Sequence, residues 1–149
     1  MAGPAVIIHP AQAVCHQAEN GTQTLHLSDM GGLSQFGAFR ETLPPGAASS
    51  RRHWHASEDE FLYAVDGTAT IADDDGPHPL SPGDAACWRH GDPNGHHVLN
   101  RSAAPCSCLI VGSRRPSDRV LCSDIDKIYI RENGVVRRTK RDGSPWHLR

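Results

Sequence analysis

Short runs of alternating apolar and polar residues recur along most of this chain, whereas no convincing window has the period of an amphipathic helix. Alternation places successive side chains on opposite faces of an extended chain, so each run predicts a β-strand with one buried face. The predicted strands are residues 22–27, 36–43, 60–66, 68–72, 84–88, 96–100, 106–111, 126–130 and 135–138. The pattern therefore predicts an all-β protein.

Turn-forming residues separate these strands. Asp73-Asp-Asp-Gly76 predicts one hairpin, and Asn133-Gly134 predicts another because both residues tolerate a positive φ. Ser81-Pro-Gly-Asp84 suits a type II turn, with proline at its second position and glycine at its third. Many short strands joined in this way are typical of a sandwich or barrel with Greek-key connections.

The chain of 149 residues has the length of one domain and contains no internal repeat. We expect a single domain over residues 1–149, with its core at about residues 20–111. Residues 1–20 are expected to form an irregular lead-in, and residues 112–149 an appended C-terminal extension.

Charge is distributed unevenly around a formal net charge of −2. Residues 1–111 hold 5 basic and 12 acidic side chains, whereas residues 112–149 hold 10 basic and 5 acidic ones. Because acids are interspersed and aromatics are few in the basic segment, we expect it to pack on its own or a partner's acidic barrel rather than on nucleic acid.

The chain also carries no sign of a membrane or secretory location. No apolar stretch approaches the roughly 18 residues of a membrane span, and the N-terminus lacks the basic segment of a signal peptide. The five cysteines are odd in number and do not suggest a disulfide framework. We therefore expect a cytoplasmic protein without a membrane partner.

Two histidines and a glutamate form the first candidate site. His53 and His55 are two residues apart, so on an extended strand both rings project from one face. Glu60 opens the next predicted strand after a short turn, and antiparallel pairing would return its carboxylate to the imidazoles. Imidazole nitrogens with a carboxylate oxygen suit a divalent transition metal.

A second stretch supplies a third imidazole. Gly83 precedes a strand, and the segment Gly91-Asp-Pro-Asn-Gly95 turns the chain just before His96 and His97. Spacing to Asn100 favours His96 over His97, as do the opposite faces that neighbouring strand residues occupy.

These two stretches resemble the two motifs of the cupin superfamily. The first motif is present as Gly46, His53-Trp-His55, Glu60 and Gly67, with six residues rather than five after Gly46. The second matches at Gly83, His96 and Asn100, but its P-x-G portion stands here in altered order. The motifs span about 55 residues, and the whole chain is similar to small bacterial single-domain cupins that usually have no assigned reaction.

The resemblance implies a double-stranded β-helix, or jelly-roll barrel, that carries N- and C-terminal extensions. It implies one divalent transition metal, with Mn, Fe, Ni, Zn, Co and Cu not distinguished, held by His53, His55, Glu60 and His96. Such a set would leave about two positions of a six-coordinate ion open to a small oxygen-rich ligand. A homodimer is also expected. The alternative, a barrel that has lost its metal, is less favoured because all four ligand types are present.

Other residues near the motifs have both functional and structural interpretations. Arg40, on the strand before the first motif, could pair with a substrate carboxylate, although such an arginine is more often a solvated surface group. His90 and His97 could carry protons at the barrel mouth, or His97 could face outward. Tyr63 and Trp88 are expected to serve in packing, and Cys106 and Cys108 to be small buried hydrophobes.

The leading functional hypothesis is an enzyme in which the metal polarises a small oxygen-rich substrate. Dioxygenase, decarboxylase, lyase and isomerase reactions all have precedent in the family, and nothing in the sequence selects among them. The alternative is a binding or sensory module that holds a small ligand without turning it over.

Overall fold

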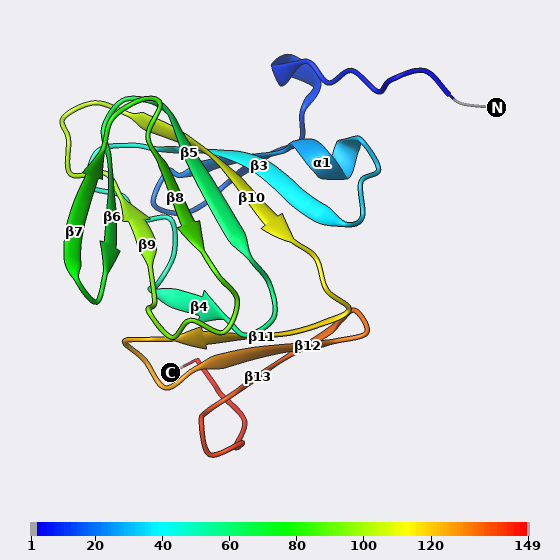
Figure 1. Cartoon of the computed structure of the whole chain (residues 1–149), viewed down its shortest axis with the longest axis vertical. Coiled ribbons are helices and arrows are strands. Elements are labelled where there is room, and N and C mark those ends of the chain that lie inside the picture. Colours follow the sequence, from blue (N-terminus) through cyan, green and yellow to red (C-terminus); the bar gives the residue numbers. More distant parts are fainter. Residues whose placement is uncertain (1–2, 149) are drawn as a thin grey trace.

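The computed structural model describes residues 3–148 and is built almost entirely from antiparallel β-strands (Figure 1). One sheet has the order β1-β2-β3-β10-β5-β8, a second β7-β6-β9 and a third β13-β12-β11-β4. The strands of the first sheet are β1 (Cys15–Gln17), β2 (Gln23–His26), β3 (Phe36–Leu43), β10 (Cys106–Ser113), β5 (Glu60–Asp66) and β8 (Ala85–Trp88). The second contains β7 (Gly76–Leu80), β6 (Ala69–Asp73) and β9 (His97–Leu99), and the third contains β13 (Val135–Thr139), β12 (Ile128–Glu132), β11 (Ser117–Cys122) and β4 (His53–His55). The all-β jelly-roll prediction is confirmed.

The first two sheets enclose the apolar core. Its buried members come from both sheets and from the connection after β3: Leu43, Ala47, Leu62, Ala69, Ile71, Val98, Cys106, Cys108 and Ile110. Cys106 and Cys108 are fully buried on one face of β10, as predicted. Few aromatic side chains contribute, so aliphatic and thiol groups fill the barrel.

The predicted turns are present. Asp73 pairs with Gly76 at the β6–β7 hairpin, and Asn133 and Gly134 have φ values of 50° and 80° in the β12–β13 hairpin. In the turn before β8, Gly83 has φ 98° and the Asp84 amide donates to the Ser81 carbonyl at 3.0 Å. Local turn chemistry therefore determines these three reversals.

Predicted strand boundaries agree with the structure within two residues, and β3 and β5 match at both ends. Four strands are missing from the predicted list: β1, β4, β7 and β11, although an extended strand was assumed for the His53–His55 pair of β4. Pro77 and Pro79 obscured β7, but that strand lies at the edge of its sheet, where a missing amide is tolerated. Two short helices, η1 (Pro10–Gln12) and α1 (Leu27–Met30), accompany the N-terminal segment. Neither has the length and apolarity to cross a membrane, and no helix of residues 3–148 does.

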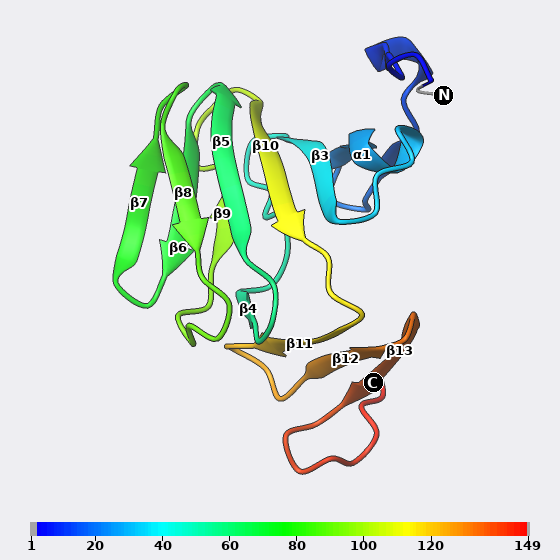
Figure 2. The same cartoon turned by 45° about the vertical axis from the view of Figure 1, so that its right-hand side comes forward.

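The C-terminal segment forms part of the site region rather than a free extension. Its strand β11 pairs with β4, placing Val120 opposite His55 and Cys122 opposite His53. Figures 1 and 2 show β11, β12 and β13 lying across one end of the barrel, next to β4. Contact is close at Gly95, where an added Cβ would lie 1.8 Å from Ser123 Oγ. A glycine before His96 thus allows the second motif to pack against this sheet.

Candidate metal centre

Strand β4 places two imidazoles side by side. The ring centroids of His53 and His55 lie 5.2 Å apart, as expected for alternate residues of one strand. Glu60 begins β5, and its Oε2 atom lies 3.4 Å from His55 Nε2. The carboxylate therefore lies beside the histidine pair, but not through the predicted pairing of the two strands, because β4 pairs with β11 whereas β5 pairs with β10 and β8.

His96 joins the same group from the segment before β9. Its backbone exchanges two hydrogen bonds with His53, at 3.0 and 3.1 Å, and the two ring centroids are 5.3 Å apart. His96 Nε2 lies 3.5 Å from Glu60 Oε2. His97 instead directs Nδ1 to the Ser50 carbonyl at 2.8 Å, so His96 is the member of the pair beside Glu60.

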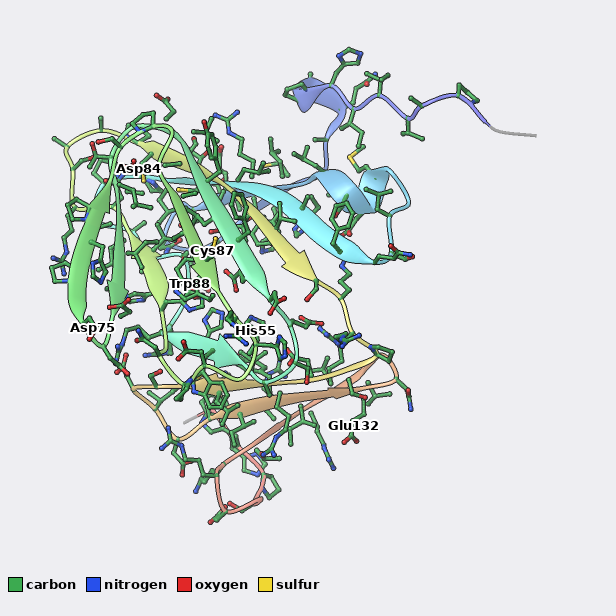
Figure 3. All side chains as sticks on the ribbon, in the orientation of Figure 1. His55, Asp75, Asp84, Cys87, Trp88 and Glu132 are labelled. Atoms are coloured by element: carbon green, nitrogen blue, oxygen red, sulfur yellow. The ribbon has the colours of Figure 1, made fainter. Side chains whose placement is uncertain are left out.

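Trp88 holds the His96 ring in place. The two rings stack with centroids 3.8 Å apart and an interplanar angle of 9°. Figure 3 shows Trp88 of β8 and His55 of β4 in the interior, on the same side of the barrel. Trp88 serves in packing, as expected, and it packs against His96, which is a candidate ligand.

The donor groups fit a divalent metal. One ligand atom each of His53, Glu60 and His96 lies within 4.8 Å of the others, and His55 reaches the same Glu60 oxygen. Both ring nitrogens of His96 are buried without a hydrogen-bond partner in residues 3–148. A buried imidazole without partners is costly, and a metal bond would compensate one of those nitrogens. Three nitrogens and one oxygen suit the transition metals from manganese to zinc.

Hydrogen bonds orient two of the three imidazoles. His53 Nδ1 lies 2.8 Å from the Arg51 carbonyl, and His55 Nδ1 lies 2.7 Å from Asp118 Oδ2. A carbonyl can only accept, so Nδ1 of His53 carries the hydrogen and Nε2 is left to bind a metal. Asp118 selects the same arrangement for His55. Asp118 itself is 3% exposed and accepts the Ser57 amide at 2.8 Å.

A second group of acidic residues lies beside His55 and is engaged in hydrogen bonds and ion pairs. Glu58 lies near His55 and Asp118, which together form another group with potential metal ligands. Glu58 Oε1, however, accepts from the Arg115 amide and from Arg131 of β12. Its charge is therefore neutralised by the C-terminal sheet. Asp118 and Glu58 were not predicted as site residues, since nothing local in the sequence connects them with His55.

The charges of the centre are strongly coupled. Burial disfavours a protonated His55, but its hydrogen bonds to Asp118 and Glu60 prevail and raise its pKa to about 9. Burial also disfavours the Glu60 carboxylate, yet the imidazoles of His55 and His96, 3.4 and 3.5 Å from its Oε2 atom, hold its pKa well below the usual range. Burial lowers the pKa of His53. The centre thus keeps an anionic oxygen and a neutral nitrogen ready for a cation.

A cavity of about 440 Å³ opens onto this centre. It is lined by the four candidate ligands and by side chains that include Glu41, Trp88, His97, Ile110, Arg114 and Arg131. Glu41 was not predicted, although a period-two reading of β3 places it on the apolar face with Phe39 and Leu43. A carboxylate on an apolar strand face is the sequence signal that would have identified it.

The two predicted substrate contacts lie away from the cavity lining. Arg40 projects from the opposite face of β3 and donates to Ser107 Oγ at 3.3 Å. Neighbouring strand residues face opposite sides of the sheet. Because Glu41 points to the inner face of β3, Arg40 points to the outer face. His90 follows β8 and pairs with Asp59 at 2.7 Å, with its side chain 56% exposed. Neither residue is among those lining the cavity, so this geometry supports neither predicted contact.

Comparison with known proteins agrees with this architecture. The family model "Cupin domain" matches residues 39–112. The crystal structure of a sugar phosphate isomerase from a cupin superfamily, from Silicibacter pomeroyi, is 44% identical, with a TM-score of 0.82 over 85% of this chain and 80% of that chain. A proposed sugar phosphate isomerase from Acidithiobacillus ferrooxidans is 24% identical, with a TM-score of 0.78 over 87% and 83%. The polyketide cyclase RemF from Streptomyces resistomycificus is 19% identical, with a TM-score of 0.64 over 80% and 87%.

The fold and site together define a small jelly-roll barrel with a histidine–carboxylate centre. The chain belongs to the cupin superfamily. No curated protein matches its sequence.

Proposed function

We propose that this cupin is a metal-dependent isomerase of small phosphorylated sugars, with the metal held by His53, His55, Glu60 and His96. The observation that carries the proposal is the convergence of His55 and His96 on one oxygen of Glu60, at 3.4 and 3.5 Å, beside His53 and open to the cavity. The 44% identity to a structure described as a sugar phosphate isomerase favours this reaction over the other cupin chemistries.

The chain's own groups prepare the site for a hydroxy-carbonyl compound. A divalent metal held there supplies a Lewis acid for the oxygens of the substrate. Asp118 keeps His55 in the tautomer that presents Nε2, and Trp88 fixes the plane of His96. The cavity of about 440 Å³ accommodates a small molecule.

Two arginines of the cavity are the candidate partners of a substrate phosphate. Arg114 and Arg131 line it, and each pairs with one carboxylate, Asp29 and Glu58 respectively. A guanidinium offers five N–H groups, so each arginine retains donors beyond those pairs. Both lie at or beyond the end of β10, so the C-terminal third of the chain supplies the positive charge.

Metal content and turnover test the proposal. Untagged protein is analysed for bound metals and then assayed against triose, pentose and hexose phosphates, with aldose–ketose conversion followed by NMR. We expect His53→Ala to lose both metal and conversion, because it removes one donor. His78→Ala is the matched control, since His78 lies on β7, is half-exposed and pairs only with Asp73. Full conversion by chelated, metal-free protein contradicts the proposal, and tight binding without conversion favours a sensory module.

We also propose that two copies associate through the outer face of the first sheet. Phe61, Tyr63 and Val65 of β5 project there with 38%, 42% and 41% of their surfaces exposed. A neighbouring row of large apolar side chains on a sheet face is typical of an interface. Light scattering on wild-type protein and on Tyr63→Lys tests it, with a 16.1 kDa species expected only for the variant.

The five cysteines, all unpaired, agree with a cytoplasmic location.

A further inference from the structure

Glu41 is a half-buried carboxyl group without an assigned role. It lies on the inner face of β3, between Phe39 and Leu43, and opposite Cys108 of β10. Leu43 and Cys108 are both fully buried, so the side chain of Glu41 leaves an apolar wall and enters the cavity. A carboxyl group at such a position carries a desolvation cost that apolar residues would avoid.

The other acids of the cavity are already engaged. Asp29 pairs with Arg114, Glu58 with Arg131 and Asp59 with His90. Glu60 faces the histidines of the candidate centre. Within residues 3–148, Glu41 makes neither an ion pair nor a hydrogen bond through its carboxyl group. It is therefore the cavity acid whose oxygens remain available to a bound molecule.

The surroundings of Glu41 suit proton exchange near neutral pH. Burial, together with the negative charge of Glu60, raises the pKa of Glu41 to about 7. A group with that pKa both accepts and returns a proton at low cost at neutral pH. Glu41 and Glu60 both line the same cavity.

We propose that Glu41 is the acid–base residue that carries a proton between the two reacting carbons of the substrate, an inference that rests on the isomerase function proposed above. The carboxylate of Glu41 removes the proton from the hydroxyl-bearing carbon next to the carbonyl. The C–H electron pair becomes the C=C bond of an enediolate, and the carbonyl electron pair moves to its oxygen, which carries the negative charge.

The reverse steps complete the conversion without an oxidant or reductant. Protonated Glu41 delivers its proton to the former carbonyl carbon as the second oxygen forms the new carbonyl. The hydroxyl proton of that second oxygen passes to the neighbouring oxygen, so atoms and charges balance. One carboxyl group that serves both carbons requires a position beside, not within, the set of four candidate ligands, which is where β3 places Glu41.

Deuterium uptake from solvent tests this role. Metal-loaded wild-type protein and Glu41→Gln are incubated in D₂O with the triose, pentose and hexose phosphates, and NMR follows both conversion and deuterium at the reacting carbons. We expect wild-type protein to incorporate deuterium, and the variant to lose both conversion and incorporation by roughly 100- to 10,000-fold. Metal affinity, measured by calorimetry, and sugar phosphate binding stay within a few-fold, because glutamine keeps the size of the side chain.

Two further variants separate the possible explanations. Glu132→Gln makes the same chemical change at the end of β12, where the side chain is 60% exposed and does not line the cavity, and is expected to behave as wild type. His97→Gln removes the cavity-lining histidine that the sequence suggested as a proton carrier, and this variant is expected to retain deuterium incorporation.

The outcomes separate this inference from the proposed function. Incorporation that persists in Glu41→Gln, or that is lost in His97→Gln instead, overturns the role of Glu41 while leaving the isomerase function intact. Wild-type protein that neither converts nor exchanges any of the sugar phosphates overturns both. Conversion by wild-type protein without deuterium uptake also excludes Glu41, since it requires hydrogen to move without a solvent-exchangeable carrier.

Discussion

The barrel and the C-terminal sheet contribute to the candidate centre in different ways. All four proposed ligands and Glu41 come from the segment that matches the cupin family between residues 39 and 112, although β4, which carries His53 and His55, pairs with the C-terminal sheet. The groups that surround them come largely from the C-terminal sheet, where Asp118 orients His55 and Arg131 neutralises Glu58. The ligands and their support are thus encoded in separate parts of the chain. Substitutions in the two parts should therefore have effects of different size and on different properties.

Removal of the anionic ligand should give the largest effect. Glu60→Gln replaces the oxygen to which His55 and His96 point with a neutral amide. We expect metal affinity to fall by more than the roughly hundredfold that loss of an outer hydrogen-bond partner costs. Calorimetric titration with manganese and zinc measures it. Wild-type affinity in this variant would show that the barrel does not hold the ion through Glu60.

Glu41→Gln should stabilise the metal-free protein at alkaline pH. The pKa of Glu41 rises from 4.5 in the unfolded chain to about 7 in the fold, so the folded state retains the proton that the unfolded state releases. The resulting loss in the free energy of unfolding is absent below pH 4.5, grows as the pH rises and is complete above pH 7. Glutamine carries no charge and avoids this loss, so the free energy of unfolding of the variant should exceed that of wild type by up to about 3 kcal/mol at pH 8. Urea denaturation of chelated protein at pH 5 and pH 8 measures the difference, and an equal effect at both values contradicts the assignment.

Asp118→Asn tests the C-terminal contribution to the metal. Asparagine keeps the size of the side chain but loses the charge beside His55 Nδ1, so His55 is less firmly held with Nε2 free. We expect metal affinity to fall roughly 10- to 100-fold, less than for Glu60→Gln. A double variant with His55→Ala should show no further loss, because Asp118 acts through His55. Additive losses would point to a general effect on folding.

Arg131→Met should have the smallest effect on stability and metal affinity. It leaves Glu58, whose side chain is 10% exposed, without its cation, while Arg131 itself is one-third exposed. We expect a destabilisation of about 1–2 kcal/mol, since water still reaches part of this pair. Metal affinity should change only a few-fold, because Glu58 makes no contact with Glu60 in the structure. A loss as large as that of Asp118→Asn would mean that the whole C-terminal sheet, not one contact, determines the centre.

The amino-acid sequence determined the local features of this protein. Alternation predicted β3 and β5 at both ends, and the Asp73–Gly76, Ser81–Asp84 and Asn133–Gly134 turns follow from φ preferences of neighbouring residues. Spacing to Asn100 and the opposite faces of neighbouring strand residues favoured His96 over His97, and His96 is the one that lies beside Glu60. Such features depend on residues a few positions apart, so a linear pattern records them.

Tertiary structure decided the features that join distant segments. Asp118 meets His55 only because β11 pairs with β4, across 63 positions of the chain. Alternation along β3 marks Glu41 as a residue of the apolar face, but only the fold shows that this face lines the cavity and that Arg40 faces away from it. Residues 112–149, expected to be an appended extension, form one end of the site for the same reason. Burial and strand pairing are properties of the folded barrel, and they convert an ordinary strand carboxylate into a group placed for chemistry.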